Sequence, residues 1–456
     1  DVPARQTNHT FDYAIPKKWE GIIKPGMRVA VPFGPRKIQG FVIELKNSSD
    51  FDKLKEIDSL LDVEPVLTEE LLELGNWLTE ETLCLKIIAY QAMLPAALKA
   101  NYKKFLQLVR SLSEVDERLQ PYFRGQNLVD FEAAMGHEYA KLFQKEIVAG
   151  NIEVYYQVNN KLNKKTERSV EVLLSKEELQ QVAETINKSA RKQIQLVHYF
   201  IDHPETIAAQ KLLKITNCGE SALKGLVEKG IVKFIQTEVY RDPFKDRHFT
   251  ASEHLPLTEE QTAVFKTVKD SVLNQKNDVF LLHGVTGSGK TEVYLQSIDI
   301  ALSKGQEAIM LVPEISLTPQ MVNRFKERFG NRVAVFHSGL SVGEKYDEWR
   351  RIVRGEASIV IGARSAIFAP INNIGLIIID EEHSDSYKQT DTNPRYNAKD
   401  IAIIRGLYYN CPVIMVSATP SLEVIARANK GVYKLLSLPN RINGKELPVV
   451  KIINMN

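Results

Sequence analysis

Residues Val279–Gln296, VFLLHGVTGSGKTEVYLQ, give the clearest indication of the fold of the second half of the chain. Its apolar start predicts a buried strand, its middle is rich in glycine, and its end has the pattern of a helix. The middle matches G-x-x-x-x-G-K-T, in which glycines let backbone N–H groups close around phosphate oxygens. We therefore predict a phosphate-binding loop formed by eight consecutive residues: Gly284, Val285, Thr286, Gly287, Ser288, Gly289, Lys290 and Thr291.

Two side chains of this loop have separate expected tasks. Lys290 is expected to reach the β- and γ-phosphates of ATP, and Thr291 is expected to bind the accompanying Mg²⁺. The positive end of the following helix adds to the attraction for phosphate. A chance match is the alternative, and the strand and helix on either side of the loop count against it.

Six short apolar runs, each ending in a turn, alternate with helical patterns between residues 246 and about 440. Such alternation is typical of a parallel sheet covered by helices on both faces. We therefore expect an α/β lobe over residues 246–440, with the start of a further segment over 441–456. The six runs are residues 279–284, 308–313, 333–338, 358–363, 376–381 and 413–418.

Polar residues stand where two of these strands would end, which is where parallel sheets bind ligands. Asp380 is expected to hold Mg²⁺ through its water shell, and Glu381 is expected to orient or deprotonate the attacking water. Ser417, Ala418 and Thr419 end another run. They are expected to relay the state of the nucleotide to a neighbouring surface, unless they form an ordinary turn.

Gln261, upstream of the loop, offers a donor and an acceptor that suit the edge of adenine. Together with Thr258 it also fits a capping box, and the spacing favours that cap. Downstream, the polar loop after Glu381 carries aromatic and basic residues that are expected to stack on bases and hold phosphates. Ordinary surface tyrosines are the alternative for this loop, whose expected DNA-binding residues are Tyr387, Lys388, Arg395 and Tyr396.

The first half of the chain divides into two predicted regions. Residues 1–102 have the pattern of a small β-rich unit with a helical tail, in which Arg28–Phe33 and Gln39–Leu45 flank the Gly34-Pro35 turn. Residues 103–245 are expected to be mostly helical. Near their end, three helical patterns and a strand-like run follow one another in the order of a winged helix, a unit that binds DNA or merely packs against protein.

The composition, 44% hydrophobic and 25% charged with a net charge of +2, is that of a globular protein. Any basic surface for nucleic acid must therefore be local. The three cysteines, Cys84, Cys218 and Cys411, lack the spacing of a zinc site, and reduced cytoplasm is the expected compartment. No apolar stretch reaches the roughly 18 residues that a membrane span needs.

Together, these motifs resemble those of superfamily 2 helicases. Within that superfamily, the chain is similar over essentially its whole length to the PriA family of bacterial replication-restart helicases. The segments that carry the resemblance are GVTGSGKTEVY (284–294), LVPEISLTPQ (311–320), SGLSVGEKYDEW (338–349), GARSAIFAP (362–370), DEEH (380–383), SATPS (417–421), FDYAIP (11–16) and VPFGPRKIQGFV (31–42).

The resemblance implies a multidomain fold: a small β-rich domain that binds a DNA 3′ end (1–102), a winged-helix domain (103–245) and one RecA-like lobe (246–440). It implies an ATP-dependent 3′ to 5′ DNA helicase that recognises stalled or abandoned replication forks and helps reload the replicative helicase. The implied partners are forked DNA with a nascent 3′ end, single-stranded DNA, other primosome proteins, single-stranded-DNA-binding protein and the replicative helicase. The implied protein is a monomer that works at forks in the bacterial cytoplasm and does not bind membranes.

The same resemblance implies four residues for the DNA 3′ end. Phe11 would stack on the terminal base, Asp12 would bind the 3′-OH, Gly34 would let the backbone approach closely, and Lys55 would bind phosphate. A core aromatic residue and a plain turn are the simpler alternatives for Phe11 and Gly34.

Several family features have no counterpart in this sequence. The second RecA-like lobe, which would supply an arginine finger, the zinc-binding cysteines and the C-terminal domain are missing, so zinc is expected only in that missing part. We expect the chain itself to bind DNA and nucleotide with little turnover. Asn397 stands where the resemblance leads us to expect histidine.

A non-catalytic recruitment module and a small-molecule P-loop kinase are the alternative functions.

Overall fold

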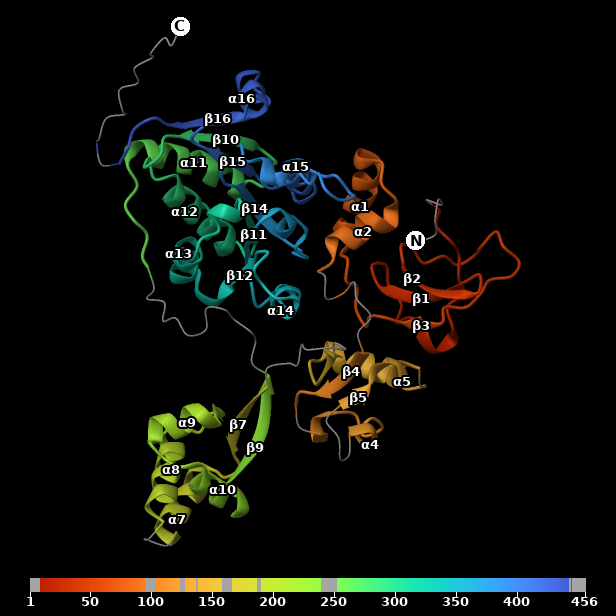
Figure 1. Cartoon of the computed structure of the whole chain (residues 1–456), viewed down its shortest axis with the longest axis vertical. Coiled ribbons are helices and arrows are strands. Elements are labelled where there is room, and N and C mark those ends of the chain that lie inside the picture. Colours follow the sequence, from red (N-terminus) through yellow and green to blue (C-terminus); the bar gives the residue numbers. More distant parts are fainter. Residues whose placement is uncertain are drawn as a thin grey trace. The chain divides into compact units, whose positions relative to one another are not determined.

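A seven-stranded parallel sheet forms the centre of the C-terminal region, in the order β12-β13-β11-β14-β15-β10-β16. The computed structural model describes residues 9–95, 98, 103–110, 112–123, 128–136, 138–157, 166–186, 190–238, 252–442 and 444 (Figure 1). The expected α/β lobe with a parallel sheet is confirmed, because six strands coincide with the six apolar runs. These strands are β10 Val279–Gly284, β11 Glu307–Leu311, β12 Val333–Phe336, β13 Ile359–Gly362, β14 Ile374–Ile379 and β15 Val413–Ser417.

The seventh strand, β16 (Lys434–Leu438), was not predicted from the sequence. Three of its five residues are exposed, so its segment lacks the continuous apolar run that marks the other strands. It lies at the edge of the sheet beside β10, whereas every residue of the central strand β14 is buried. Helices therefore cover both faces of the sheet at its centre.

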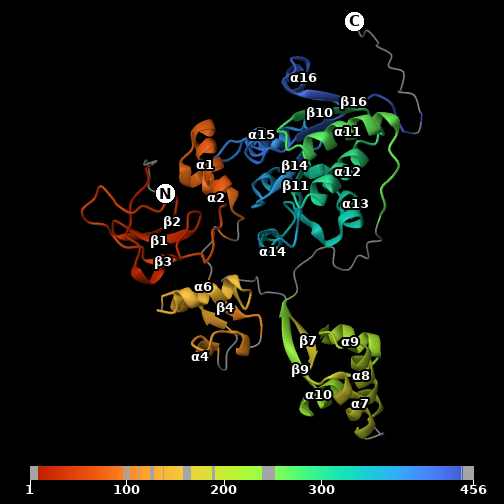
Figure 2. The same cartoon turned by 180° about the vertical axis from the view of Figure 1, so that it is seen from behind.

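Six helices of this lobe surround the sheet (Figure 2). Several contact its strands directly, including α12 on β11 and β14, α15 on β14, and α16 on β10. Short 3-10 helices occupy the loops at the ends of the strands. The bounds are α11 Glu259–Leu273, α12 Lys290–Ser303, α13 Pro319–Phe329, α14 Val342–Val353, α15 Ala398–Tyr409 and α16 Leu422–Asn429, with η3 Glu314–Ser316, η4 Gly330–Arg332, η5 Arg364–Phe368 and η6 Asp385–Tyr387.

The N-terminal region contains the expected hairpin. β1 (Arg28–Phe33) pairs antiparallel with β2 (Arg36–Phe41) across the Gly34-Pro35 turn, and β3 (Ser59–Leu60) pairs on the other side of β1. The 3-10 helix η1 (Lys17–Trp19) precedes them, and helices α1 (Glu69–Thr82) and α2 (Lys86–Met93) follow. The Thr68 side chain accepts a hydrogen bond from Leu71 N and so caps α1.

Residues 103–157 form a second small antiparallel sheet, where mostly helical structure was expected. Strand β4 pairs on one side with β5 and on the other with β6, both distant in sequence, and local periodicity does not reveal such pairing. Buried side chains of this sheet and its helices share one core with the N-terminal hairpin. The elements are β4 Lys103–Leu108, η2 Leu112–Glu114, α4 Gln120–Phe123, β5 Leu128–Asp130, α5 Phe131–Met135, α6 Ala140–Val148 and β6 Ile152–Gln157.

By its contacts the chain divides into two compact units, Asp1–Asn159 with Asp246–Asn456, and Asn160–Lys245. The second unit contains the predicted order of three helices followed by a strand: α8 Arg191–Asp202, α9 Ala209–Thr216, α10 Glu220–Glu228 and β9 Val232–Glu238. It also contains β7 Thr166–Val172, α7 Lys176–Thr185 and β8 Ile207–Ala208, and its sheet has the order β8-β7-β9. The winged-helix assignment and the boundary at residue 103 stay predictions.

The described parts of the chain hold all three cysteines, each buried and unbonded to another cysteine. None of the helices in those parts combines the length and apolar character that crossing a bilayer requires.

A buried ion pair ties the N-terminal helix α1 to helix α15 of the lobe. The guanidinium of Arg405 donates to both carboxylate oxygens of Glu70 at 2.9 and 2.8 Å, and also to the carbonyls of Ile367 and Ala369. The side chains are 0% and 4% exposed. Helix α1 lies beside α15 (Figures 1 and 2). A charge buried this deeply is tolerated only while its partner stays in place.

We expect the substitution Arg405→Met to destabilise the first unit by roughly 3–5 kcal/mol, because it strands the Glu70 carboxylate without a partner. Urea denaturation followed by tryptophan fluorescence measures the loss. The double variant Glu70→Leu/Arg405→Met should recover most of it, since apolar side chains replace both charges. A single variant as stable as the unaltered chain would contradict the buried pair.

Candidate active site

The phosphate-binding loop leaves the end of β10 and enters helix α12 as the sequence predicts. Gly287 and Gly289 have φ angles of 84° and 78°, in the left-handed region that glycine adopts without strain. Gly289 is the N-cap of α12 and provides no side chain to cap it. The first N–H groups of the helix therefore face the loop without a side-chain partner, as phosphate binding requires.

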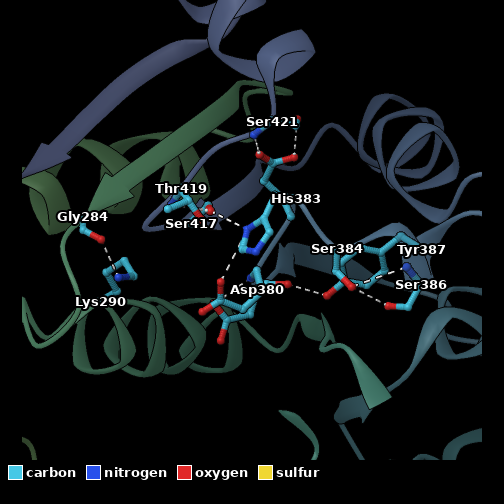
Figure 3. Close-up of polar contacts among 12 residues, drawn as sticks. Gly284, Lys290, Asp380, His383, Ser384, Ser386, Tyr387, Ser417, Thr419 and Ser421 are labelled. Atoms are coloured by element: carbon cyan, nitrogen blue, oxygen red, sulfur yellow. Dashed lines mark hydrogen bonds and ion pairs between the residues drawn. The ribbon is translucent and has the colours of Figure 1, made fainter. Parts of the chain in front are cut away.

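Lys290 is folded back onto its own loop. Its Nζ donates to the Gly284 carbonyl at 2.6 Å (Figure 3). It also donates to the Val285 carbonyl at 3.2 Å. Burial lowers the pKa of Lys290, while Asp380 and Glu381 act in the opposite direction. Carbonyl dipoles stabilise the ammonium less than a full negative charge would, so the amine suits an anionic ligand.

Ser288 gives a second indication that the loop fits phosphate. Its side chain is 2% exposed, and within the described structure its Oγ is buried without a hydrogen-bond partner. An unpaired buried hydroxyl costs free energy that a bound ligand can recover. The residues of the loop therefore fit a nucleotide.

Tyr294, which the sequence analysis did not single out, lies between the two expected magnesium-binding side chains. Its hydroxyl is 3.2 Å from Thr291 Oγ1 and 3.5 Å from Asp380 Oδ2. Burial raises its pKa strongly, so the ring is neutral at physiological pH. The signal in the sequence was its place one helical turn after Thr291, on the same face of α12.

Asp380 lies at the end of β14, within reach of the loop. Burial, and then the neighbouring charge of Glu381, raises the pKa of its carboxyl from 3.8 to about 6. Glu381 has a φ of 46°, which turns the chain sharply after the strand, and its N–H donates to Asp380 Oδ1 at 3.0 Å. The Glu381 carboxylate is 38% exposed and free to meet a water molecule from the solvent side.

His383 joins this carboxylate segment to the end of β15. Its Nδ1 lies 2.8 Å from Ser417 Oγ and 3.5 Å from Glu381 Oε2 (Figure 3). Ser417 Oγ in turn accepts a hydrogen bond from Thr419 N at 3.0 Å. Ser417 therefore contacts the predicted catalytic segment directly, and Thr419 is linked to it through Ser417, while Ala418 lies between them in the chain.

Glu382 is completely buried and links two other segments. Its carboxylate accepts hydrogen bonds from Ser421 N and Oγ at 2.6 and 2.9 Å and from Lys399 Nζ at 3.1 Å. Lys399 lies in the first turn of α15 and Ser421 follows β15. Sequence reasoning assigned no role to Glu382 or Lys399, because nothing in their spacing shows that the chain brings them together.

Gln261 forms the cap that its spacing favoured. Its side chain and that of Thr258 make a reciprocal capping box at the start of α11, and its Nε2 also donates to the Ser288 carbonyl at 2.8 Å. The side chain is 2% exposed. Both polar groups of its amide are therefore engaged within the protein. Its expected contact with adenine stays a prediction.

The loop after the carboxylates places its two tyrosines inside the lobe. Tyr387 and Tyr396 are 1% and 4% exposed, so neither ring is available to stack on a base in this structure. The Tyr387 hydroxyl donates to the Asp380 carbonyl, and the Tyr396 ring packs edge-on against Phe368. Lys388 and Arg395, in contrast, are exposed and free to approach phosphates.

Arg364 holds this loop in place from the end of β13. Its guanidinium donates to the Lys388 carbonyl at 2.7 Å and lies over the Tyr396 ring at 5.8 Å. Asn397, at the position where histidine was expected, accepts a hydrogen bond from Lys399 N through its side chain and caps α15. The loop is therefore fixed at both ends to the lobe.

The N-terminal sheet borders a separate pocket of about 610 Å³. Phe11 and Asp12 line this pocket, whereas Gly34 and Lys55 do not. Phe11 packs edge-on against Phe33, and Gly34 forms the β1–β2 turn with a φ of 58°. Lys55 is exposed, and its carbonyl accepts a hydrogen bond from Ala14 N.

Asp12 has two partners in this pocket that sequence reasoning missed. Ser49 Oγ donates to Asp12 Oδ2 at 2.6 Å, and Lys46 Nζ lies 3.7 Å from Asp12 Oδ1. Both come from the irregular segment between β2 and β3, where no periodic pattern points to them. The pocket thus combines an apolar floor with a carboxylate, an ammonium and a hydroxyl at its polar side.

Comparisons with known proteins give the class of this site. Residues 258–428 match the family model of the DEAD/DEAH box helicase, and residues 1–95 match that of the PriA 3′DNA-binding domain (3′BD). The C-terminal lobe is therefore a helicase domain. A solved structure of RecG bound to a three-way DNA junction is 21% identical, with a TM-score of 0.31, over 42% of this chain and 25% of that chain.

The relatives among curated proteins are more specific. Replication restart protein PriA of Bacillus subtilis is 52% identical over 100% of this chain and 57% of that protein. Replication restart protein PriA of Synechocystis sp. is 35% identical over 100% of this chain and 56% of that protein. The whole chain is therefore similar to these PriA proteins, and it spans a little over half of their length.

The raised pKa of Asp380 predicts a pH-dependent stability. Its folded pKa of about 6 exceeds the ordinary 3.8, so between these values the folded state binds the proton more tightly than the unfolded state. The ionised carboxylate therefore lowers stability above pH 6, and the penalty fades as the pH falls toward 3.8. Asp380→Asn should be more stable than the unaltered chain by roughly 3 kcal/mol at pH 7.5 and by about half that at pH 5.

Urea denaturation in buffer free of metal and nucleotide checks this difference at both pH values. The exposed Asp391 provides a matched control, since Asp391→Asn should change stability little at either pH. A difference for Asp380→Asn that stays constant from pH 7.5 to pH 5 would contradict the raised pKa.

Proposed function

We propose that this chain works as an ATP-dependent DNA helicase of replication restart, which recognises stalled or abandoned forks through the nascent 3′ end. The observation that carries the proposal is the presence, in one chain, of an intact helicase nucleotide site and a PriA-type 3′DNA-binding domain. The 3′ to 5′ polarity, the reloading of the replicative helicase and the low turnover of the chain by itself are parts of the same proposal. So are its partners in the primosome.

The residues of the nucleotide site have different proposed roles in binding ATP and Mg²⁺. When ATP binds, Lys290 exchanges its two loop carbonyls for phosphate oxygens, and the N–H groups of the loop hold the remaining oxygens. Thr291 and Asp380 present the hydroxyl and carboxylate oxygens that Mg²⁺ prefers, and Tyr294 keeps the two side chains in register. Magnesium would supply charge neutralisation between the phosphates.

Glu381 is the proposed general base. Its exposed carboxylate turns away from the strand next to Asp380, where it can orient a water molecule and take its proton. His383 connects Glu381 to Ser417 and Thr419, so a change at the reacting phosphate can reach the segment after β15. The Tyr387 hydroxyl connects the same strand end to the loop that carries Lys388 and Arg395.

The pocket beside the N-terminal sheet suits a DNA end. Asp12 can accept a hydrogen bond from a 3′-OH, Lys46 can balance the approaching phosphate, and Phe11, which is 39% exposed, offers an aromatic face to the terminal base. A 3′-phosphate would place negative charge against the Asp12 carboxylate. This pocket therefore favours an unblocked end.

Replacing Lys290 tests the nucleotide site. Lys290→Ala should lower the affinity of the chain for ATP by more than about tenfold, because the cation that meets the phosphates is lost. Affinity for forked DNA should stay within about twofold, since the pocket and the exposed loop are untouched. Calorimetry with ATP and fluorescence anisotropy with a fork measure the two affinities. Lys266→Ala, an exposed lysine on α11, is the matched control. Parallel loss of both affinities would contradict separate sites.

Blocking the DNA end tests the pocket. A fork whose leading-strand 3′ end carries phosphate should bind several-fold more weakly than the 3′-OH fork, because the phosphate repels Asp12. Asp12→Asn should remove most of this preference, while Asp50→Asn, outside the pocket, should keep it. Fluorescence anisotropy with the two forks measures it. Equal binding of both forks by the unaltered chain would show that the pocket does not sense the 3′-OH.

A further inference from the structure

The segment that follows β16 runs across the phosphate-binding loop. Parallel pairing places Leu438 opposite Gly284, so the chain leaves the sheet at the point where the loop begins. Two backbone hydrogen bonds hold the segment there: Val285 N donates to the Leu438 carbonyl at 3.2 Å, and Ile442 N donates to the Gly287 carbonyl at 3.0 Å. The end of this segment is therefore built into the wall of the nucleotide site.

A further contact fastens the segment to helix α11. Asn440 Nδ2 donates to Glu260 Oε1 at 2.6 Å, one residue before Gln261. On this side of the loop, a Cβ placed on Gly289 would lie 2.2 Å from Gln261 Nε2 and 2.5 Å from Ile442 Cδ1. Gln261 and Ile442 thus border the same glycine, and the space beside the loop lies between α11 and the segment.

Two groups of the segment are poorly satisfied by the protein itself. Arg441 lies beside Gly287, with its Cγ 3.9 Å from the position of a Cβ there, and its buried Nε has no hydrogen-bond partner among the described residues. Ile442 is 59% exposed although it stands directly beside the loop. The unpartnered guanidinium N–H would gain from a hydrogen-bond acceptor, and the exposed apolar side chain would gain from being covered by a ligand.

We infer that Arg441 and Ile442 form the base-side wall of the nucleotide site. The loop and Lys290 already account for the phosphates, whereas an apolar side chain next to a guanidinium group suits the flat ring of a purine base. Arg441 stacks on or donates to the base, and Ile442 packs against its face. Gln261 is buried, and its side chain is already hydrogen-bonded to Thr258 N and Ser288 O. We therefore assign the contact with the base to Arg441 and Ile442.

This inference rests on the proposed nucleotide site and predicts a selective loss. Arg441→Ala and Ile442→Ala should each weaken ATP binding by roughly five- to tenfold. Neither should change the affinity for inorganic tripolyphosphate by more than about twofold, because that ligand has no base. Isothermal titration calorimetry of the chain with each ligand, in the presence of Mg²⁺, makes the comparison. Lys430→Ala and the exposed Val432→Ala are matched controls from the turn before β16 and should change neither affinity.

The two ligands separate a base contact from a damaged loop. Equal weakening of ATP and tripolyphosphate binding would overturn the inference, since the variants would then act through the loop itself. Unchanged ATP affinity in both variants, with Lys290→Ala still defective, would overturn the inference and leave the proposed function standing. Failure of the unaltered chain to bind ATP at all would overturn the proposed function, and this inference with it.

Discussion

Parallel pairing around β10 is the constraint on which the nucleotide site depends. β10 lies between β15 and β16, and β14 lies beyond β15, so the segments that follow these strands meet at one edge of the sheet. The register sets His283 opposite Ser417 and Gly284 opposite Leu438. Because β14 and β15 are buried along their whole length, a slip of one residue would move the polar strand ends away from the loop and disturb the apolar core.

The sequence predicted the lobe well because its signals are local. Continuous apolar runs mark buried parallel strands, and the glycine pattern of the loop has a backbone geometry of its own. The prediction was weaker where pairing partners are distant or partly polar: β4 was expected in a helical region, and β16 lacks an apolar run. Both segments form strands because they pair with strands that are distant in the sequence and come close only in the folded chain.

The same distinction holds for the site. Lys290, Asp380 and Glu381 were predicted from motifs, while the structural contacts of Tyr294, Glu382 and Lys399 join separate elements. The tyrosines after Glu381 show the limit of reading residue type alone. An aromatic ring in a polar loop suggested base stacking, but Tyr387 is instead buried with its hydroxyl on the Asp380 carbonyl. Any movement of this loop therefore acts directly on the backbone of the carboxylate segment.

The buried carboxylate of Glu382 has a consequence for how this sequence can vary. Lys399 on α15 and Ser421 after β15 both bind this carboxylate, and among the described residues neither contacts another acidic side chain. Replacing Glu382 alone would leave the partly buried Lys399 ammonium without its counter-charge. Positions 382 and 399 are thus expected to vary together, because a substitution at one of them leaves the other without its partner. The carboxylate segment after β14 and the helix α15 are therefore expected to have evolved together at these two positions.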